Sequence, residues 1–240
     1  MSGKIIQRDG KYDNSKFVGW AEQNEVGQSY RTDHAFVNYQ IPVNANKYPL
    51  GFIHGYGSSG VCWEMTPDLN NHKQDIPAIN SLMDKIDYGI LITHSADGYP
   101  GWVVAMENKN VKAVASFEPG GFVFSEDEVP ELISSLMVTS KGIPVKADDF
   151  NKLTKIPIFL YFGDYIPEEP SKNLGDENWR VRLHMARKFV ETINRHGRNA
   201  TLVELPKIGI HSNTHFLMQD LNNDKIADLL NEWLIKNNLK

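Results

Sequence analysis

The sequence predicts an α/β fold in which a mostly parallel β-sheet is flanked by helices. From residue 50 onward, short apolar runs alternate with longer segments that have helical spacing. The apolar runs are nearly continuous, as expected for strands that are buried on both faces. The chain has 240 residues, 41% hydrophobic and 23% charged, which suits a globular domain with a substantial core. We therefore expect one domain over residues 1–240, with residues 1–48 forming an N-terminal β-rich segment.

The strands are predicted from short apolar runs, which are separated by turn residues. Residues 34–42 alternate apolar and polar side chains and end at Pro42, which predicts a strand with one solvated face. The run "IPIFLYF" is almost wholly apolar, which predicts a central strand. Similar runs predict strands at residues 49–53, 88–93, 111–117, 156–162 and 201–205.

The helices are predicted where apolar side chains recur every three or four residues. Ile79, Leu82, Met83 and Ile86 fall on one stripe of such a segment. A long helix is expected to end at Gly197, and the last helix to begin at a cap near residues 222–224. Helices are thus predicted at residues 76–86, 103–107, 130–137, 179–196 and from about 222 onward.

Composition argues against several classes of partner. The net charge is −5 and no long run of Lys and Arg occurs, which argues against nucleic acid. The apolar runs are too short to span a bilayer. Cys62 is the only cysteine, so neither an intramolecular disulfide nor a Cys-x-x-Cys metal site can form. The first residues contain no apolar signal core, so we expect a cytoplasmic protein or a processed exported form.

A serine stands where a buried strand is predicted to end. The stretch "YGILITHSADGYPGW" places Ser95 after an apolar run and before Pro100, a residue that suits the first turn of a helix. A strand–turn–helix lifts a serine hydroxyl out of its surroundings, and the helix start supplies N–H groups for an oxyanion. The alternative is a serine that merely caps the helix, because Thr93 and Asp97 stand where glycines are commoner.

A glycine-rich loop precedes this serine in the chain. Residues 55–60 contain the pattern G-x-G-x-x-G, which matches the dinucleotide-binding fingerprint. The following "VCWEMTPDLN" holds aromatic residues and Pro67 rather than a helix, so a nucleotide cofactor is the less favoured interpretation. A His-Gly step after a buried strand instead fits a loop whose main-chain N–H groups point at a substrate oxygen.

A histidine and two carboxylates complete the candidate set. His215 lies after the last predicted strand, the chain order expected of a general base that follows the serine. His211 lies four residues earlier, but the loop composition between them disfavours a metal pair. Glu118 and Asp164 each end a predicted strand, and either could orient His215. Asp97 has no comparable position and is expected to be an ordinary solvated carboxylate.

These segments resemble the α/β-hydrolase superfamily and, within it, a branch of bacterial carboxylesterases. The resemblance covers most of the chain, in "VNYQIPVNANKYPLGFIHGYG", "WEMTPD", "LITHSADGYPGW", "VKAVASFEPGG", "IPIFLYFGDYI" and "LPKIGIHSNTHFLMQDLNNDKIADLLNEWL". It implies a serine hydrolase that cleaves carboxylic esters through an acyl-enzyme, without cofactor or metal. Ser95 would be the nucleophile and His215 the general base. The resemblance favours Glu118 of the "EPGG" turn as the orienting acid, with Asp164 as the alternative.

The same resemblance assigns the oxyanion hole and leaves several questions open. The oxyanion donors would be the main-chain N–H groups of Tyr56 and Ala96. Asp97, two residues after the nucleophile, departs from the branch and could deter anionic substrates. The segment between Trp63 and Ser95 has room for one helix, so a shortened sheet and cap are expected. The expected partner is a small ester, not nucleic acid or a membrane, and a homodimer remains open. The alternatives are lactone hydrolysis, acyl transfer, or ligand binding without catalysis on the same fold.

Overall fold

The computed structural model describes the backbone of four short N-terminal strands and most of the chain from residue 41 onward. The later part comprises residue 41 and residues 43–55, 76–135, 137–197 and 200–240, without the side chains of residues 77 and 78. The strands β1 (Lys4–Gln7) and β4 (Ser29–Thr32) pair antiparallel, as do β2 (Tyr12–Asp13) and β3 (Gln23–Asn24). The predicted strand at 34–42 lies outside the described residues except for residue 41.

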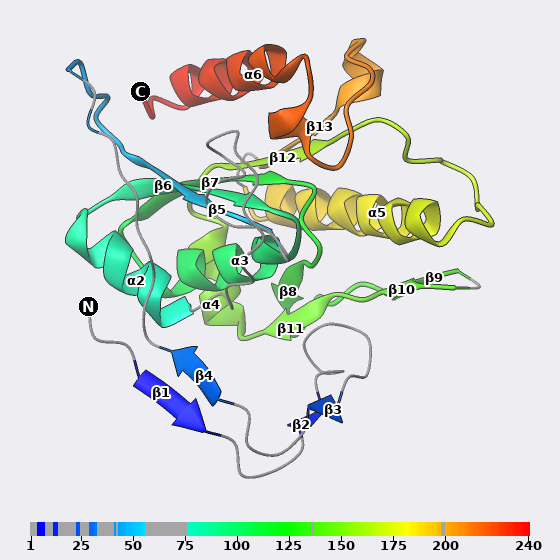
Figure 1. Ribbon diagram of the computed structural model, residues 1–240, viewed down its shortest axis with the longest axis horizontal. Coiled ribbons are helices and arrows are strands. Elements are labelled where there is room, and N and C mark those ends of the chain that lie inside the picture. The colour runs from blue at the N-terminus through cyan, green and yellow to red at the C-terminus, as the bar shows by residue number, and fades with distance from the viewer. Residues whose placement is uncertain are drawn as a thin grey trace.

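The centre of the protein is a five-stranded parallel sheet, which confirms the predicted fold class (Figure 1). Its strand order is β13-β12-β7-β6-β5, and each neighbouring pair is parallel. The carboxyl ends of all five strands therefore lie at one edge, where ligand sites of open α/β sheets occur. The strands are β5 (Leu50–Ile53), β6 (Gly89–His94), β7 (Val111–Phe117), β12 (Ile158–Phe162) and β13 (Ala200–Glu204).

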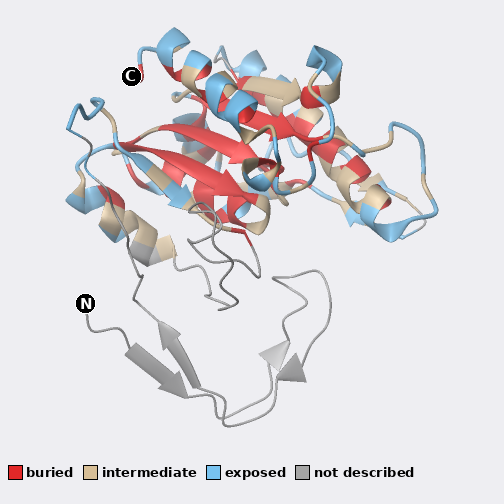
Figure 2. Cartoon of the chain, turned by 45° about the horizontal axis from the view of Figure 1, so that its top comes forward, coloured by how far each residue is buried: buried red, intermediate tan, exposed pale blue. Residues whose placement is uncertain are grey.

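Helices cover both faces of this sheet (Figure 1). One face packs against α2, α3, α4 and α5 in a core that includes Leu91, Val114 and Leu160. The other packs against α6 in a core that includes Ile92, Ala115 and Trp233. Successive strand residues thus enter different cores, which explains why the central strands are buried throughout (Figure 2). The helices are α2 (Ile76–Lys85), α3 (Gly98–Glu107), α4 (Ala147–Leu153), α5 (Leu174–Arg195) and α6 (Asn223–Lys236).

The helix predicted at residues 130–137 is wrong. This region contains β9 (Ile133–Ser134), which pairs antiparallel with β10 (Thr139–Ser140). The hydroxyl of Ser135 accepts hydrogen bonds from the main-chain N–H groups of Met137 and Val138, so the side chain stabilises a turn instead of a helix. The strand before this hairpin, β8 (Val123–Ser125), pairs in parallel with the strand after it, β11 (Ile143–Val145).

Several boundaries also differ from those predicted. The long helix α5 begins at Leu174 rather than near 179, because the side chain of Asn173 accepts hydrogen bonds from the N–H groups of Gly175 and Asp176. Helix α3 begins at Gly98, directly after the serine turn, rather than near 103. Between Trp63 and Ser95, the described residues contain one helix, α2, and the strand β6. Among the described residues, no helix is long and apolar enough to cross a membrane.

Candidate active site

Ser95 occupies a sharp turn at the carboxyl end of β6. It opens a 3-10 turn, Ser95–Asp97, that leads directly into α3. The backbone φ of Ser95 is +57°, in the left-handed region that residues other than glycine rarely adopt. Such strained positions cluster at functional sites, because the surrounding structure must hold them. The strand–turn–helix predicted from the sequence is therefore present around this serine.

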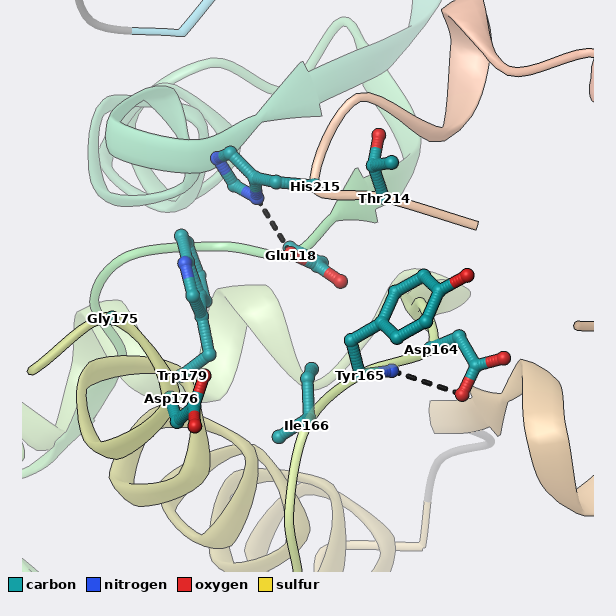
Figure 3. Close-up of a pocket in the computed structure, with 9 residues that line it drawn as sticks. All are labelled: Glu118, Asp164, Tyr165, Ile166, Gly175, Asp176, Trp179, Thr214 and His215. Atoms are coloured by element: carbon teal, nitrogen blue, oxygen red, sulfur yellow. Dashed lines mark hydrogen bonds and ion pairs between the residues drawn. The ribbon is translucent and has the colours of Figure 1, made fainter. Parts of the chain in front are cut away.

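Glu118 occupies a second turn, at the carboxyl end of the neighbouring strand β7. It is only 2% exposed, and its backbone φ is +42°. One carboxylate oxygen, Oε1, accepts a hydrogen bond from the N–H of Gly163 at 2.7 Å. The other, Oε2, lies 2.5 Å from Nδ1 of His215. Glu118 therefore connects the ends of two adjacent strands with the loop that carries the histidine (Figure 3).

The serine turn and the acid turn are packed directly against each other. The N–H of Gly120 donates to the carbonyl oxygen of Ser95 at 2.7 Å. A Cβ atom placed on Gly98 would lie 2.4 Å from Cβ of Pro119, so only glycine permits this approach. The backbone around Ser95 is therefore held close to the segment that begins with Glu118.

Gly98→Ala is expected to lower the free energy of unfolding by about 1–3 kcal/mol, because the added methyl group must push the two turns apart. Gly121→Ala is the matched control, since a Cβ there would make only ordinary contacts, 3.6 Å from Ile143 and 3.8 Å from Tyr99. Urea unfolding of both variants measures the difference. Equal stability of the two variants would contradict the tight packing of Gly98 on Pro119.

The loop that carries His215 is anchored on both sides by side-chain hydrogen bonds. Asp220 accepts from the N–H and the hydroxyl of Thr214. The side-chain amides of Asn213 and Asn222 bond to each other in both directions. Asn222 precedes α6 but forms no side-chain cap, contrary to the sequence-based expectation. Its amide group instead fastens the histidine loop to the start of that helix.

Asp164, the alternative acid, contacts this loop at a different histidine. Its carboxylate accepts a hydrogen bond from the N–H of Ser212 at 3.0 Å and lies 3.3 Å from Nδ1 of His211. These contacts, with the Ser212 N–H first, lower the pKa of Asp164. The structure therefore brings Glu118 to His215 and Asp164 to His211. His211 is exposed and bonded within the loop, as expected for a histidine outside the candidate set.

The imidazole of His215 lies between two other rings. The ring centroid of Trp179, from α5, is 4.1 Å away, and that of His94 is 4.4 Å away. Neither ring was among the catalytic residues expected for a serine hydrolase. The sequence feature that could have pointed to His94 was its position directly before Ser95, at the end of a buried strand. For Trp179 there was none, because the approach of α5 to His215 depends on tertiary packing.

A cavity of about 250 Å³ opens beside the pair formed by His215 and Glu118 (Figure 3). Trp179, Tyr165 and Ile166 supply apolar walls, and the carboxylates of Asp164 and Asp176 also line it. In the described part of the chain, Ser95 Oγ makes no hydrogen bond with His215. Contacts between nucleophile and base are often long before substrate binds.

Asp97 is not the solvated carboxylate expected from the sequence. It is fully buried, in the turn Ser95–Asp97 that follows the central strand β6. Neither carboxylate oxygen has a hydrogen-bond partner in the described structure. Burial raises the pKa of Asp97 to about 9, so the group is a neutral carboxylic acid at pH 7. A neutral group at this position supplies no charge that could deter anionic substrates.

The proposed oxyanion donors are only partly within the described residues. Ala96 lies in the 3-10 turn after the serine. Tyr56 and the rest of the glycine-rich loop lie outside the described residues, but Gly55 is described. A Cβ on Gly55 would lie 2.8 Å from Cβ of Ser95 and 2.8 Å from Nδ1 of His94. The glycine-rich loop therefore begins directly beside Ser95. Among the described residues, no cluster of three or more His, Cys, Asp or Glu could hold a metal ion.

Comparison with known proteins supports the fold. No protein-family model matches the chain, and no curated protein matches it in sequence. A solved structure titled as a novel bacterial esterase is similar over 98% of this chain and 93% of its own, with a TM-score of 0.69 and 21% identity. This likeness establishes the α/β-hydrolase fold. Est1E from Butyrivibrio proteoclasticus (16% identity, 82% and 91% coverage, TM-score 0.45) and a dienelactone hydrolase from Anabaena variabilis (16%, 82% and 89%, 0.47) are more distant.

Proposed function

We propose that this protein is a serine hydrolase that cleaves carboxylic esters through an acyl-enzyme intermediate. Ser95 is the nucleophile, His215 the general base and Glu118 the acid that orients His215. The observation that carries the proposal is the 2.5 Å contact between Nδ1 of His215 and Oε2 of the buried Glu118, formed beside the strained turn of Ser95.

This contact selects the chemical form of His215 that a general base requires. A carboxylate only accepts hydrogen bonds, so Nδ1 carries the proton and Nε2 keeps a free electron pair. Gly163 holds the second carboxylate oxygen of Glu118, so the carboxylate cannot rotate away without losing a buried hydrogen bond. When Nε2 accepts the serine proton, the negative charge of Glu118 stabilises the imidazolium that forms.

The reaction then follows from these positions. Nε2 of His215 removes the proton of Ser95 Oγ as that oxygen attacks the ester carbonyl carbon. Main-chain N–H groups of Ala96 and Tyr56 stabilise the negative oxygen of the tetrahedral intermediate. The proximity of Gly55 to Ser95 supports this part, because Tyr56 follows Gly55 in the chain. The alcohol leaves with the proton from His215, and water, activated by the same nitrogen, releases the acid.

Ser95→Ala is expected to lower kcat for p-nitrophenyl esters by about 10⁴–10⁶-fold, because base and acid have no nucleophile left to activate. Ser134→Ala is the matched control, since its exposed hydroxyl bonds to Thr139 across the hairpin of β9 and β10, away from the proposed site. Steady-state rates with acyl chains of increasing length measure the effect.

A fluorophosphonate probe should modify the wild-type protein at Ser95, which mass spectrometry detects. Equal turnover by Ser95→Ala and wild type would end the proposal.

A further inference from the structure

His94 joins the serine turn to the histidine loop across 121 residues of sequence. Its Nε2 lies 2.9 Å from the main-chain carbonyl oxygen of His215. A carbonyl oxygen only accepts, so Nε2 of His94 carries the proton and donates it. The imidazole of His94 is 1% exposed, and its ring centroid lies 4.4 Å from that of His215. His94 thus contacts both the main chain and the ring of the proposed general base.

The surroundings of His94 keep it in this donating form. Burial, followed by the nearby charge of His215, lowers the pKa of His94 to about 3. His94 is therefore neutral at pH 7. A neutral neighbour does not repel the imidazolium that forms on His215 during attack. The two histidines can consequently lie side by side while only one of them accepts the serine proton.

We infer that His94 is a positioning residue, whose Nε2–H sets the distance between the imidazole of His215 and the hydroxyl of Ser95. This inference rests on the proposed function. His94 precedes Ser95, so its side chain is mounted on the same strand end as the nucleophile. The Glu118 carboxylate orients the His215 ring through Nδ1, whereas His94 holds the main chain from which that ring extends.

The two contacts act on different motions of His215. Loss of the His94 bond leaves the bond to Glu118 and the anchors of Asn213 and Thr214 in place, but it allows the main chain at His215 itself to shift. Trp179 still covers the ring from α5, so substrate contacts in the cavity are largely kept. A shift of about 1 Å between reacting groups can cost about 10²-fold in rate. The cost is therefore expected in kcat and not in KM.

Three variants at position 94 test this inference. His94→Gln keeps a donor at the place of Nε2, His94→Asn carries the same amide group on a shorter chain, and His94→Leu has no donor. With p-nitrophenyl butyrate, we expect His94→Gln to keep kcat within about tenfold of wild type. His94→Asn and His94→Leu should each lose about 10²-fold in kcat, with KM within about threefold. The rate of fluorophosphonate labelling of Ser95 should follow the same order, and circular dichroism checks the fold.

Each possible result for these variants either supports or overturns the role of His94. The inference would be overturned if the folded Gln and Asn variants had comparable kcat, or if a folded Leu variant were as active as wild type. A loss confined to KM would also overturn it. A Gln variant that folds but loses as much kcat as Leu would also overturn it, because the donor is restored without effect. If Asn fails to fold, the comparison of Gln with Leu remains.

Ser95→Ala, measured alongside, separates the role of His94 from the proposed function. An active Ser95→Ala refutes the proposed function. An inactive Ser95→Ala with a fully active His94→Asn refutes only the role of His94.

Discussion

Glu118→Gln is expected to lower kcat for ester hydrolysis by about 10⁴-fold, with KM nearly unchanged. The amide keeps the size of the carboxylate and can still accept from the N–H of Gly163. It has no negative charge, however, so the imidazolium of His215 loses its stabilising partner. The amide can also present its NH₂ group to Nδ1, which would force the proton of His215 onto Nε2. A histidine protonated at Nε2 cannot accept the serine hydrogen.

Asp164→Asn is the matched control for this prediction. Asp164 ends the next strand of the sheet and, like Glu118, bonds to a main-chain N–H and to a histidine. Its histidine is His211, which makes no contact with the proposed nucleophile among the described residues. We expect kcat within about tenfold of wild type in this variant. Steady-state kinetics on one ester compares the two variants, and a larger loss in Asp164→Asn would reverse the assignment of the acid.

Asp97→Asn is expected to change the free energy of unfolding more favourably at pH 7.5 than at pH 4, by about 4–5 kcal/mol. The folded protein keeps a proton on Asp97 up to a pKa of about 9, from an ordinary value of 3.8. The unfolded chain releases that proton near its ordinary pKa. The folded state therefore binds more protons between about pH 4 and pH 9, so wild-type stability falls as pH rises through this window. Asparagine has no proton to retain and escapes this cost.

Urea unfolding at pH 4 and pH 7.5 measures the Asp97 effect directly. Asp148→Asn is the matched control, because Asp148 is exposed and lies in the first turn of α4, and it should change stability by less than about 0.5 kcal/mol at either pH. A gain for Asp97→Asn that is the same at both pH values would show that an uncharged amide merely packs better. An effect of Asp97→Asn that does not become more favourable from pH 4 to pH 7.5 would contradict the burial of a neutral acid beside the serine.

Much of the parallel sheet could be predicted from local patterns. The continuous apolar runs that became β6, β7 and β12 are required because both faces of these strands contact a core. The change from "ILIT" to "HSAD" marked the turn of Ser95, although the buried strand β6 itself continues through His94. The position of His215 followed from the chain order of serine and base. The single-domain organisation over residues 1–240 remains a prediction.

Other predictions were wrong because the local sequence pattern was compatible with more than one structure. Residues 130–137 contain apolar residues at helical spacing, but Ser135 bonds to the main chain ahead of it and closes a hairpin. Asp97 was expected to be solvated, because it does not end a predicted strand as Glu118 and Asp164 do. Its burial is set by the tertiary structure, which no pattern near residue 97 reveals.

The sequence by itself determined the alternation of strands and helices and the position of Ser95 at a strand end, because these depend on residues close together in the chain. Only the tertiary structure decided which carboxylate meets His215, how His94 and Trp179 enclose its ring and why Asp97 is neutral. Glu118 and Asp164 end adjacent strands and are nearly equivalent as sequence. The physical reason is that each contact joins residues many positions apart, and the packing of α5 and the histidine loop on the sheet sets the distances between them.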